Sequence, residues 1–237
     1  MPSRANAAPA FLYVPGLGDV GSATVLSEAE SHYVSRVCRA REGELVRGTD
    51  GCGRIASLRL SAVGAAARAT VESIEPVARV RNVWMLCGEP EGNRDDWMVE
   101  KLAELGVARW TPLDTTRATW GDDARRRERW QRLAIAALKQ SCSAWLMQLD
   151  APAPLDSALS NIPAGASRWL ASEQGSRPLA GQGAADVVAV VGPAPGLAPE
   201  EMEWLLSRQF TAVSLAQTRL RAETAAISVA AWWSASP

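Results

Sequence analysis

Two segments near the end of the chain combine an apolar run with a tight loop. The run 186–191 stops at Gly192–Gly196, and the run 212–216 leads into a segment that carries Arg221 and Glu223. Short runs of β-branched and small apolar residues are typical of strands that are buried on both faces. Open α/β sheets bind ligands at loops that follow the carboxyl ends of such strands. The sequence therefore predicts a ligand site at these two loops.

Arg221 is the charged residue of these loops that is best suited to act on a ligand. It stands at the start of the last helical segment, where a guanidinium can bind a phosphate or stabilise a developing oxyanion. A structural ion pair with Glu223 or another carboxylate is the alternative, and the sequence leaves both open. Glu223 and Thr224 are better suited to cap or brace the helix than to do chemistry.

The composition argues against several other kinds of site. The net charge of −1 gives no global signal for nucleic acid, so an RNA site has to be a local patch. The candidate metal ligands Cys38, Cys52, Cys87, Cys142 and His32 form no close cluster, so no metal site is expected. No apolar stretch approaches the roughly 20 residues that span a bilayer, and no membrane partner is expected.

The beginning of the chain and its thiols indicate where the protein works. Residues 1–10 have no apolar core of a secretory signal and are expected to form a loose leader. Scattered cysteines in such a chain are typical of reduced thiols, which predicts a cytoplasmic protein.

The segment Gly16–Gly21 matches the dinucleotide pattern GxGxxG. That pattern requires a full strand before it and a helix that opens within it. Only about four strand-like residues precede it and Pro15 adjoins the first glycine, so a loop is the better interpretation. A nicotinamide-dependent enzyme stays as a remote alternative.

Residues 1–78 are predicted to form a small β-barrel domain with one helix. Ser27 and Glu30 form a capping box for a helix over 28–39, which carries Arg36 and Arg39. This basic edge is either a solvated face or an RNA contact. Short strands are expected at 11–14, 45–47, 54–62 and 69–74, with a turn at Asp50-Gly51.

Residues 79–237 alternate strands with helices, which predicts an α/β domain with a mostly parallel sheet. Asn93 is expected to cap a helix over 94–105, and Asp122 a helix that runs to about Cys142. Pro112 is expected to end a strand that begins at Val107. Another strand is expected at 168–171, followed by a mobile connection over 175–183.

Five ordered motifs extend from residue 32 to residue 225. They are His32-Tyr33-x-x-x-Val37-x-Arg39, Glu100-Lys101-x-x-Glu104-Leu105-Gly106-Val107, Arg129-Trp130-x-x-Leu133-Ala134-x-x-Ala137-x-x-Gln140, Gly192-Pro193-x-x-Gly196 and Leu220-Arg221-Ala222-Glu223-Thr224-Ala225. Together they resemble the bacterial RsmE-type family of small-subunit (16S) ribosomal RNA uridine-N3 methyltransferases, which belongs to the SPOUT superfamily. The resemblance covers roughly residues 11–232.

The resemblance implies a PUA-like barrel that helps to bind RNA, a trefoil-knotted α/β domain and a homodimer. It implies S-adenosylmethionine as cofactor, a role in ribosome biogenesis, and Arg221 as the catalytic residue. The implied cofactor-binding residues are Leu170, Gly192, Ala194, Gly196, Leu197, Ser214, Leu215, Ala216 and Leu220. The expected RNA contacts are His32, Arg36, Arg39, Arg94 and Arg117.

Four positions depart from the family pattern. Ala194 and Pro195 stand where the family usually has Glu-Gly, Ala216 replaces a glycine, and Ser143 replaces an arginine. Pro195 fixes φ and removes an amide donor, and Ala216 adds a Cβ where backbone approaches the cofactor. These changes leave open a second hypothesis, a catalytically inactive paralogue that binds RNA or assists ribosome assembly.

Overall fold

The computed structural model describes residues 10–160, 162–177 and 186–235. The chain divides into two compact units, of which the first is Met1–Arg79 with Leu138–Leu146 and the second is Val80–Ala137 with Met147–Pro237. The segment Leu138–Leu146 packs with the first unit, although it lies within the range 79–237 expected for the second domain. Most of the expected leader and the later part of the expected mobile connection lie outside the described residues.

The first unit contains a five-stranded sheet with strand order β1-β3-β4-β5-β2. Its strands are β1 (Phe11–Tyr13), β2 (Ala23–Val25), β3 (Leu45–Thr49), β4 (Arg54–Ala62) and β5 (Arg68–Pro76). Antiparallel pairs join β3 to β4 and β4 to β5, and β1 lies parallel to β3. Alternate strand residues such as Val46, Leu58 and Leu60 form its apolar core. The predicted strands are confirmed, whereas β2 was not predicted.

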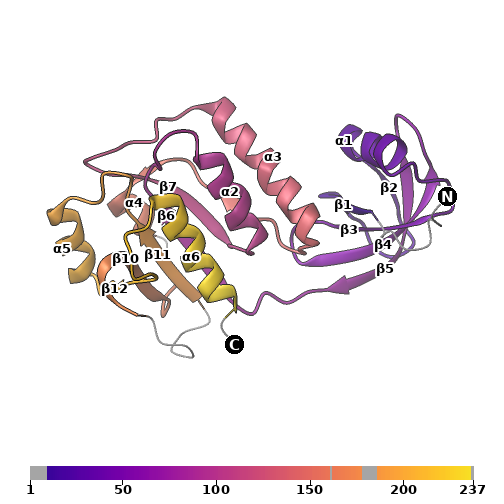
Figure 1. The fold of residues 1–237 in the computed structure, drawn as a ribbon. Helices are drawn as coiled ribbons and strands as arrows, with labels where there is room; N and C mark the ends of the chain where they lie inside the picture. The colour runs from indigo at the N-terminus through magenta and orange to yellow at the C-terminus, as the bar shows by residue number, and fades with distance from the viewer. Residues whose placement is uncertain (1–9, 161, 178–185, 236–237) are drawn as a thin grey trace. The chain divides into compact units, whose positions relative to one another are not determined.

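One helical segment accompanies this sheet (Figure 1). It consists of α1 (Glu28–His32) and a π-helical continuation, η2 (Tyr33–Val37). The Ser27 side chain accepts a hydrogen bond from the Glu30 amide, as the capping box predicts. The second half of that prediction is wrong, because the buried Glu30 carboxylate binds Lys139 Nζ at 2.8 Å instead of reaching back to Ser27.

The Gly16–Gly21 segment is a loop, as predicted. It connects β1 to β2, and no helix opens within it. The dinucleotide interpretation therefore lacks the strand-loop-helix context that it requires.

The second unit contains a parallel sheet in which β12-β10-β11-β6-β7-β8 are neighbours and β9 also pairs with β7. The strands are β6 (Asn82–Cys87), β7 (Arg109–Asp114), β8 (Gln148–Leu149), β9 (Ala153–Pro154), β10 (Ser167–Ser176), β11 (Asp186–Val191) and β12 (Thr211–Val213). The helices are α2 (Asp95–Glu104), α4 (Leu155–Leu159), α5 (Pro199–Ser207) and α6 (Ala222–Ala235), and α3 (Ala124–Ser141) begins in this unit. The predicted mostly parallel sheet is confirmed.

Helices cover both faces of this sheet (Figure 1). On one face, Leu86, Val188 and Val190 pack with Leu205 of α5 and with partly buried residues of α4. On the other, α6 packs on β6, β10 and β11 and also against α2. Burial on both faces explains why β11 is a continuous apolar run. Among the described residues, no helix is long and apolar enough to cross a membrane.

Three predicted boundaries in this unit are wrong. Pro112 does not end β7 but lies inside it, opposite Cys87. A proline has no amide N–H to donate to a neighbouring strand. β7 tolerates one here because β8 pairs with residues before Pro112 and β9 pairs with residues after it. The N-cap of α2 is Arg94 rather than Asn93. At α3, Asp123 rather than Asp122 accepts the hydrogen bond from the first-turn amide of Arg125.

Candidate functional site

A cavity of about 490 Å³ opens in the second unit, where three neighbouring strands end. Its walls come from the part of β10 that follows Leu170, where pairing with β11 stops, and from the segments after Val191 and Val213, where β11 and β12 end. These strands are parallel neighbours, so their carboxyl ends meet at one edge of the sheet. The volume is in the range of small-molecule and cofactor sites.

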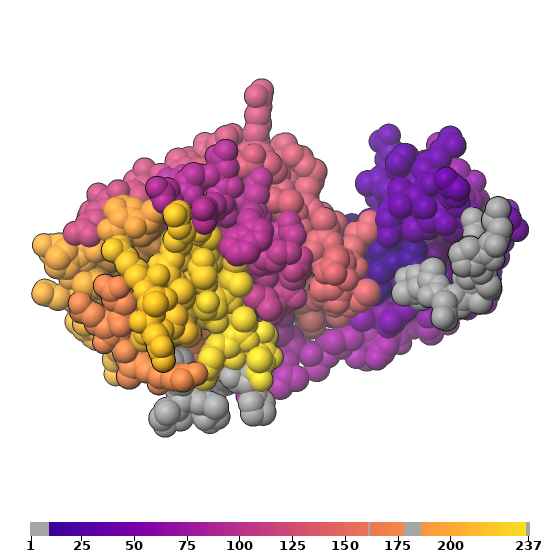
Figure 2. All heavy atoms as spheres, in the orientation of Figure 1, coloured from indigo at the N-terminus to yellow at the C-terminus, as the bar shows by residue number. Residues whose placement is uncertain are grey.

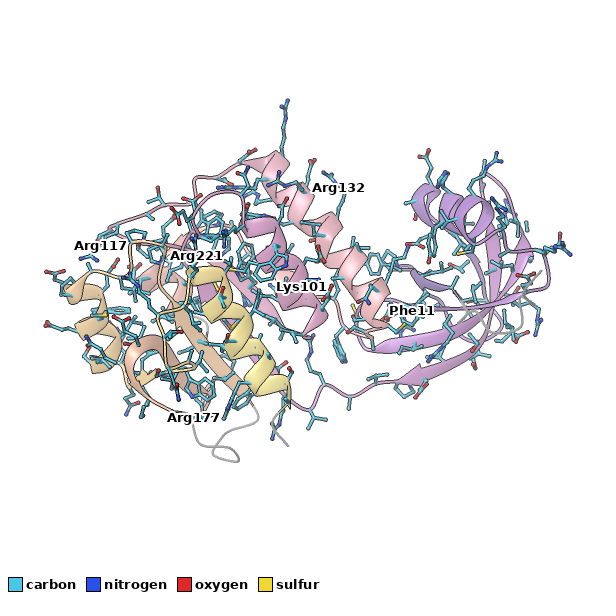
Figure 3. All side chains as sticks on the ribbon, viewed as in Figure 1. Phe11, Lys101, Arg117, Arg132, Arg177 and Arg221 are labelled. Atoms are coloured by element: carbon cyan, nitrogen blue, oxygen red, sulfur yellow. The ribbon has the colours of Figure 1, made fainter. Side chains whose placement is uncertain are left out.

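The cavity brings together the residues predicted from the loops. The nine predicted cofactor-binding residues all line it, namely Leu170, Gly192, Ala194, Gly196, Leu197, Ser214, Leu215, Ala216 and Leu220. Arg221 and Arg117 line it as well. In Figure 3, Arg221 lies where α6 begins and Arg117 lies toward α5, whereas Arg177 lies at the lower side of the unit.

Backbone contacts hold the loop 192–197. The Ala194 amide donates to the Glu89 carbonyl at 3.0 Å, and the Gly196 amide donates to the Pro193 carbonyl at 2.7 Å. Gly196 has φ of +80°, which favours glycine. At Gly88, a Cβ would lie 2.6 Å from Pro193 Cδ and 2.7 Å from its Cα, so the close packing of this loop requires glycine there.

Arg117 was predicted to contact RNA, and in this structure it supports the same loop. Its Nη1 donates to the Pro195 carbonyl at 3.2 Å. The neighbouring Thr116 amide donates to Glu201 Oε1 at 2.9 Å. The segment that contains Arg117 therefore braces the loop from outside the sheet.

The loop after β12 forms another wall of the cavity. β12 is shorter than predicted and ends at Val213. Both Ala171 and Ser176 of β10 lie opposite Val213, so residues 172–175 leave the ladder and form a bulge. Glu173, an exposed residue of this bulge, lines the cavity. The Ser214 amide donates to the Ser176 carbonyl at 2.9 Å and joins the bulge to the loop after β12.

Arg221 makes one ion pair at the cavity. Its Nη1 lies 2.9 Å from Glu91 Oε2, and both side chains are exposed. Glu91 follows β6 and was not predicted as part of the site, although its place after the carboxyl end of a strand was a usable signal. The alternative considered for Arg221 was an ion pair with Glu223 or another carboxylate. The structure shows the second form, with Glu91 as partner, while Glu223 pairs with Arg94.

Glu223 is a buried carboxylate in the first turn of α6. Its side chain is 1% exposed, and Oε1 accepts from Arg94 Nη1 at 2.6 Å. Arg94, a predicted RNA contact, is about half exposed and does not line the cavity. The expected bracing role of Glu223 agrees with this pair, which joins α6 to the N-terminus of α2.

Thiol and metal chemistry find no support around the cavity. Burial raises the pKa of the Cys87 thiol to about 12, so this thiol stays protonated and is no nucleophile. Within residues 10–160, 162–177 and 186–235, no group of three or more His, Cys, Asp or Glu side chains could hold a metal ion.

The remaining predicted RNA contacts lie in the first unit. His32 ends α1, Arg36 belongs to η2 and Arg39 follows it, and all three side chains are exposed. Arg39 has φ of +52°, which is unusual for a residue with a side chain. The structure thus places the predicted contacts in two groups, one around the cavity and one on this helical segment.

The chain matches the model of the RNA methyltransferase domain family over residues 78–234. Ribosomal RNA small subunit methyltransferase E of Mycobacterium bovis is 29% identical over 229 residues, which cover 91% of this chain and 87% of that protein. The protein of the same name from Synechocystis is 27% identical over 218 residues, covering 87% of this chain and 71% of its own length.

Solved structures agree with the sequence comparisons. Ribosomal RNA small subunit methyltransferase E from Neisseria gonorrhoeae, bound to S-adenosyl methionine, has a TM-score of 0.84 at 25% identity and covers 94% of this chain and 96% of that chain. A probable rRNA methyltransferase from Porphyromonas gingivalis has a TM-score of 0.81 at 26% identity, with coverages of 94% and 96%. The predicted SPOUT-type α/β fold with a small barrel domain is confirmed. This chain therefore belongs to the RNA methyltransferase domain family, and the relatives it resembles over most of its length are small-subunit methyltransferases of the E type.

Proposed function

We propose that this protein is an S-adenosylmethionine-dependent methyltransferase that modifies N3 of a uridine in small-subunit ribosomal RNA. The observation that carries the proposal is the cavity, because it gathers all nine residues that the family motifs assign to the cofactor. The relative from Neisseria gonorrhoeae, which covers nearly the same length, binds this cofactor.

The residues around the cavity fit such a cofactor. The volume of about 490 Å³ is sufficient for a nucleoside with an amino-acid tail. At Gly192, a Cβ would lie 3.1 Å from the Leu197 amide nitrogen, so glycine allows this loop to close tightly. The exposed carboxylate of Glu173 also suits a ligand that carries positive charge.

Bound S-adenosylmethionine would supply a methyl group on a sulfonium, which an incoming nucleophile can displace in line. The neutral imide of uracil is a poor nucleophile, so the N3 proton must leave and negative charge spreads to the ring oxygens. Arg221 is the residue we assign to those oxygens, because a guanidinium offers five N–H donors and the pair with Glu91 occupies few of them. Glu91 in turn limits where the Arg221 guanidinium can lie.

The departures from the family pattern are compatible with a closed loop. Although Pro195 lacks an amide donor, its carbonyl accepts from Arg117. Ala194 uses its amide to bind Glu89, and the Ala216 carbonyl accepts from Ser214 Oγ at 3.0 Å. Ser143 makes a local turn in the first unit through hydrogen bonds with Trp145. The loop is thus formed despite these departures, so they do not exclude the enzyme.

The same proposal includes the features that the resemblance implies for the whole molecule. The PUA-like first unit would bind ribosomal RNA through His32, Arg36 and Arg39. The second unit would contain the trefoil knot, and the protein would work as a cytoplasmic homodimer. The exposed cationic side chains of the first unit support the RNA role, because phosphate contacts need accessible cations.

Methyl transfer to the natural substrate tests the proposal. The purified protein is incubated with labelled S-adenosylmethionine and small ribosomal subunits that lack the modification, and the RNA is digested to nucleosides for mass spectrometry. We expect labelled 3-methyluridine, and roughly a hundredfold lower rate for Arg221→Met. Labelled methyl on another position would contradict the N3 assignment, and no transfer by a protein that binds the cofactor would favour the inactive paralogue.

A further inference from the structure

Some of the charged side chains that line the cavity are bound by other protein groups, and others are not. Three carboxylates and three guanidinium groups belong to residues that line it, namely Glu91, Glu173, Glu223, Arg117, Arg219 and Arg221. Four of these six are engaged by protein groups. Glu91 pairs with Arg221, Glu223 pairs with Arg94, and Arg117 donates to a carbonyl.

Glu173 and Arg219 are the exceptions. Among the residues that the structure describes, neither side chain has a hydrogen bond or an ion pair. Both are exposed and both line the cavity. Figure 2 shows the C-terminal segment, in yellow, at the surface of the second unit beside the orange atoms of the segments before it. The cavity therefore offers one available anion and one available cation to a ligand.

These two charges come from different walls of the cavity. Glu173 belongs to the bulge of β10, whereas Arg219 belongs to the loop between β12 and α6. The hydrogen bond from the Ser214 amide to the Ser176 carbonyl joins these two segments. A ligand group that carries both signs of charge suits this pair of side chains, whereas an RNA phosphate would be repelled by Glu173.

We propose that Glu173 and Arg219 bind the two charged ends of the amino-acid tail of S-adenosylmethionine. The Glu173 carboxylate accepts from the α-ammonium group, and the Arg219 guanidinium donates to the α-carboxylate. This inference rests on the proposed function, since it assigns residues to a part of the same cofactor. It makes the two side chains determinants of cofactor specificity that were not predicted from the sequence.

Three ligands separate the tail from the rest of the cofactor. S-adenosylmethionine carries the tail and a sulfonium, S-adenosylhomocysteine carries the tail with a neutral sulfur, and 5′-methylthioadenosine lacks the tail. Calorimetric titration of the full-length protein with each ligand measures binding without activity. For Glu173→Gln and Arg219→Gln we expect about a tenfold weaker affinity for the first two ligands and an unchanged affinity for the third.

Matched control variants come from charged residues outside the cavity. Glu203→Gln on α5 and Arg132→Gln on α3 alter exposed side chains that do not line it, and both should bind all three ligands like the wild type. Selective loss of the two tailed ligands in the cavity variants, with the controls unchanged, would support the inference.

Four results would overturn it. Unchanged affinity for the tailed ligands would remove the contact, and equal weakening of all three ligands would indicate damage to the whole cavity. Weakening of S-adenosylmethionine alone would assign Glu173 to the sulfonium instead of the tail. Failure of the wild-type protein to bind any of the three ligands would overturn the proposed function together with this inference. The other results concern the variants alone and leave the proposed function in place.

Discussion

The arginines around the cavity and those on the helical segment of the first unit are held in opposite ways. Arg94 pairs with a buried carboxylate, and Arg117 donates to a loop carbonyl. In contrast, the side chains of Arg36 and Arg39 are exposed and have no hydrogen bond or ion pair within the described part of the chain. Arg94 and Arg117 therefore stabilise the surroundings of the cavity. Arg36 and Arg39 can instead bind a phosphate without the loss of a contact within the protein.

This difference separates two roles that a count of basic residues would merge. An arginine that neutralises a buried acid is part of the fold, because its removal leaves a charge without a partner in a poorly solvated place. An exposed arginine contributes little to stability and can contribute to binding. Four variants are ordered from the largest expected effect to the smallest. The first and the last test this separation, and the two between them test the cavity loop and the first unit.

Arg94→Met should have the largest effect on stability. It leaves the Glu223 carboxylate, which is 1% exposed, without its cation. We expect a loss of about 3 kcal/mol in the free energy of unfolding, measured by urea denaturation. Arg221→Met is the matched control, because its partner Glu91 is exposed and the loss should stay below about 1 kcal/mol. Equal losses in the two variants would contradict the distinction.

Gly88→Ala should weaken cofactor binding while the protein stays folded. The new Cβ would lie 2.6 Å from Pro193 Cδ, and the 192–197 loop would have to move. Overpacking of this kind costs about 1–3 kcal/mol, which corresponds to roughly a ten- to hundredfold loss of affinity for S-adenosylmethionine by calorimetry. Gly16→Ala is the control, because a Cβ at that position would have no atom within 4 Å and its φ lies outside the left-handed region. Wild-type affinity in Gly88→Ala would show that this loop does not contact the ligand.

Asp50→Asn should remove a pH-dependent contribution to the stability of the first unit. Burial acts to raise the pKa of Asp50, but hydrogen bonds from the Arg54 side chain and from the Cys52 and Arg54 amides outweigh it and lower that pKa. A lowered folded-state pKa gives stability that is present above the unfolded pKa of about 3.9 and is lost as pH falls through the folded value.

Hydrogen exchange of the β3 and β4 amides measures this contribution locally. At neutral pH we expect Asp50→Asn to lower protection by about 1.5 kcal/mol, as for hydrogen bonds to a charged group. The difference from the wild type should shrink as the pH is lowered below about 4. A difference that stays constant down to about pH 2 would show that the charge of Asp50 is not involved.

The double substitution Arg36→Ala with Arg39→Ala should have the smallest energetic effect. We expect RNA affinity to fall several-fold and the slope of log K against log salt to decrease by about 1–2, since two phosphate contacts are lost. Stability and cofactor affinity should not change. Filter binding over a salt series measures the slope, and an unchanged slope would exclude this segment from the RNA site.

The sequence predicted most of the second unit because its strands are buried on both faces. The run 186–191 is β11 without correction, and the loop after it lines the cavity as expected. Pro112 misled the prediction because the position of a proline relative to the ends of neighbouring strands is a tertiary property. In the same way, the π-helical turn after His32 and the Lys139 partner of Glu30 depend on contacts that local patterns do not contain.

The charges of the site were harder to predict than its loops. The pairs of Arg221 with Glu91 and of Glu223 with Arg94 each join residues about 130 positions apart. Spacing along the chain carries no information about such pairs. Glu173 was missed for a related reason, since the bulge that places it at the cavity interrupts a strand that the sequence predicts to end at Ala171.

Titration of the wild-type protein with S-adenosylmethionine tests the central claim most directly. We expect saturable binding with micromolar affinity, roughly −8 kcal/mol, because contacts within the chain form the cavity and close its 192–197 loop. The absence of binding heat at millimolar cofactor, in a protein shown to be folded, would contradict the assignment of the cavity to this cofactor.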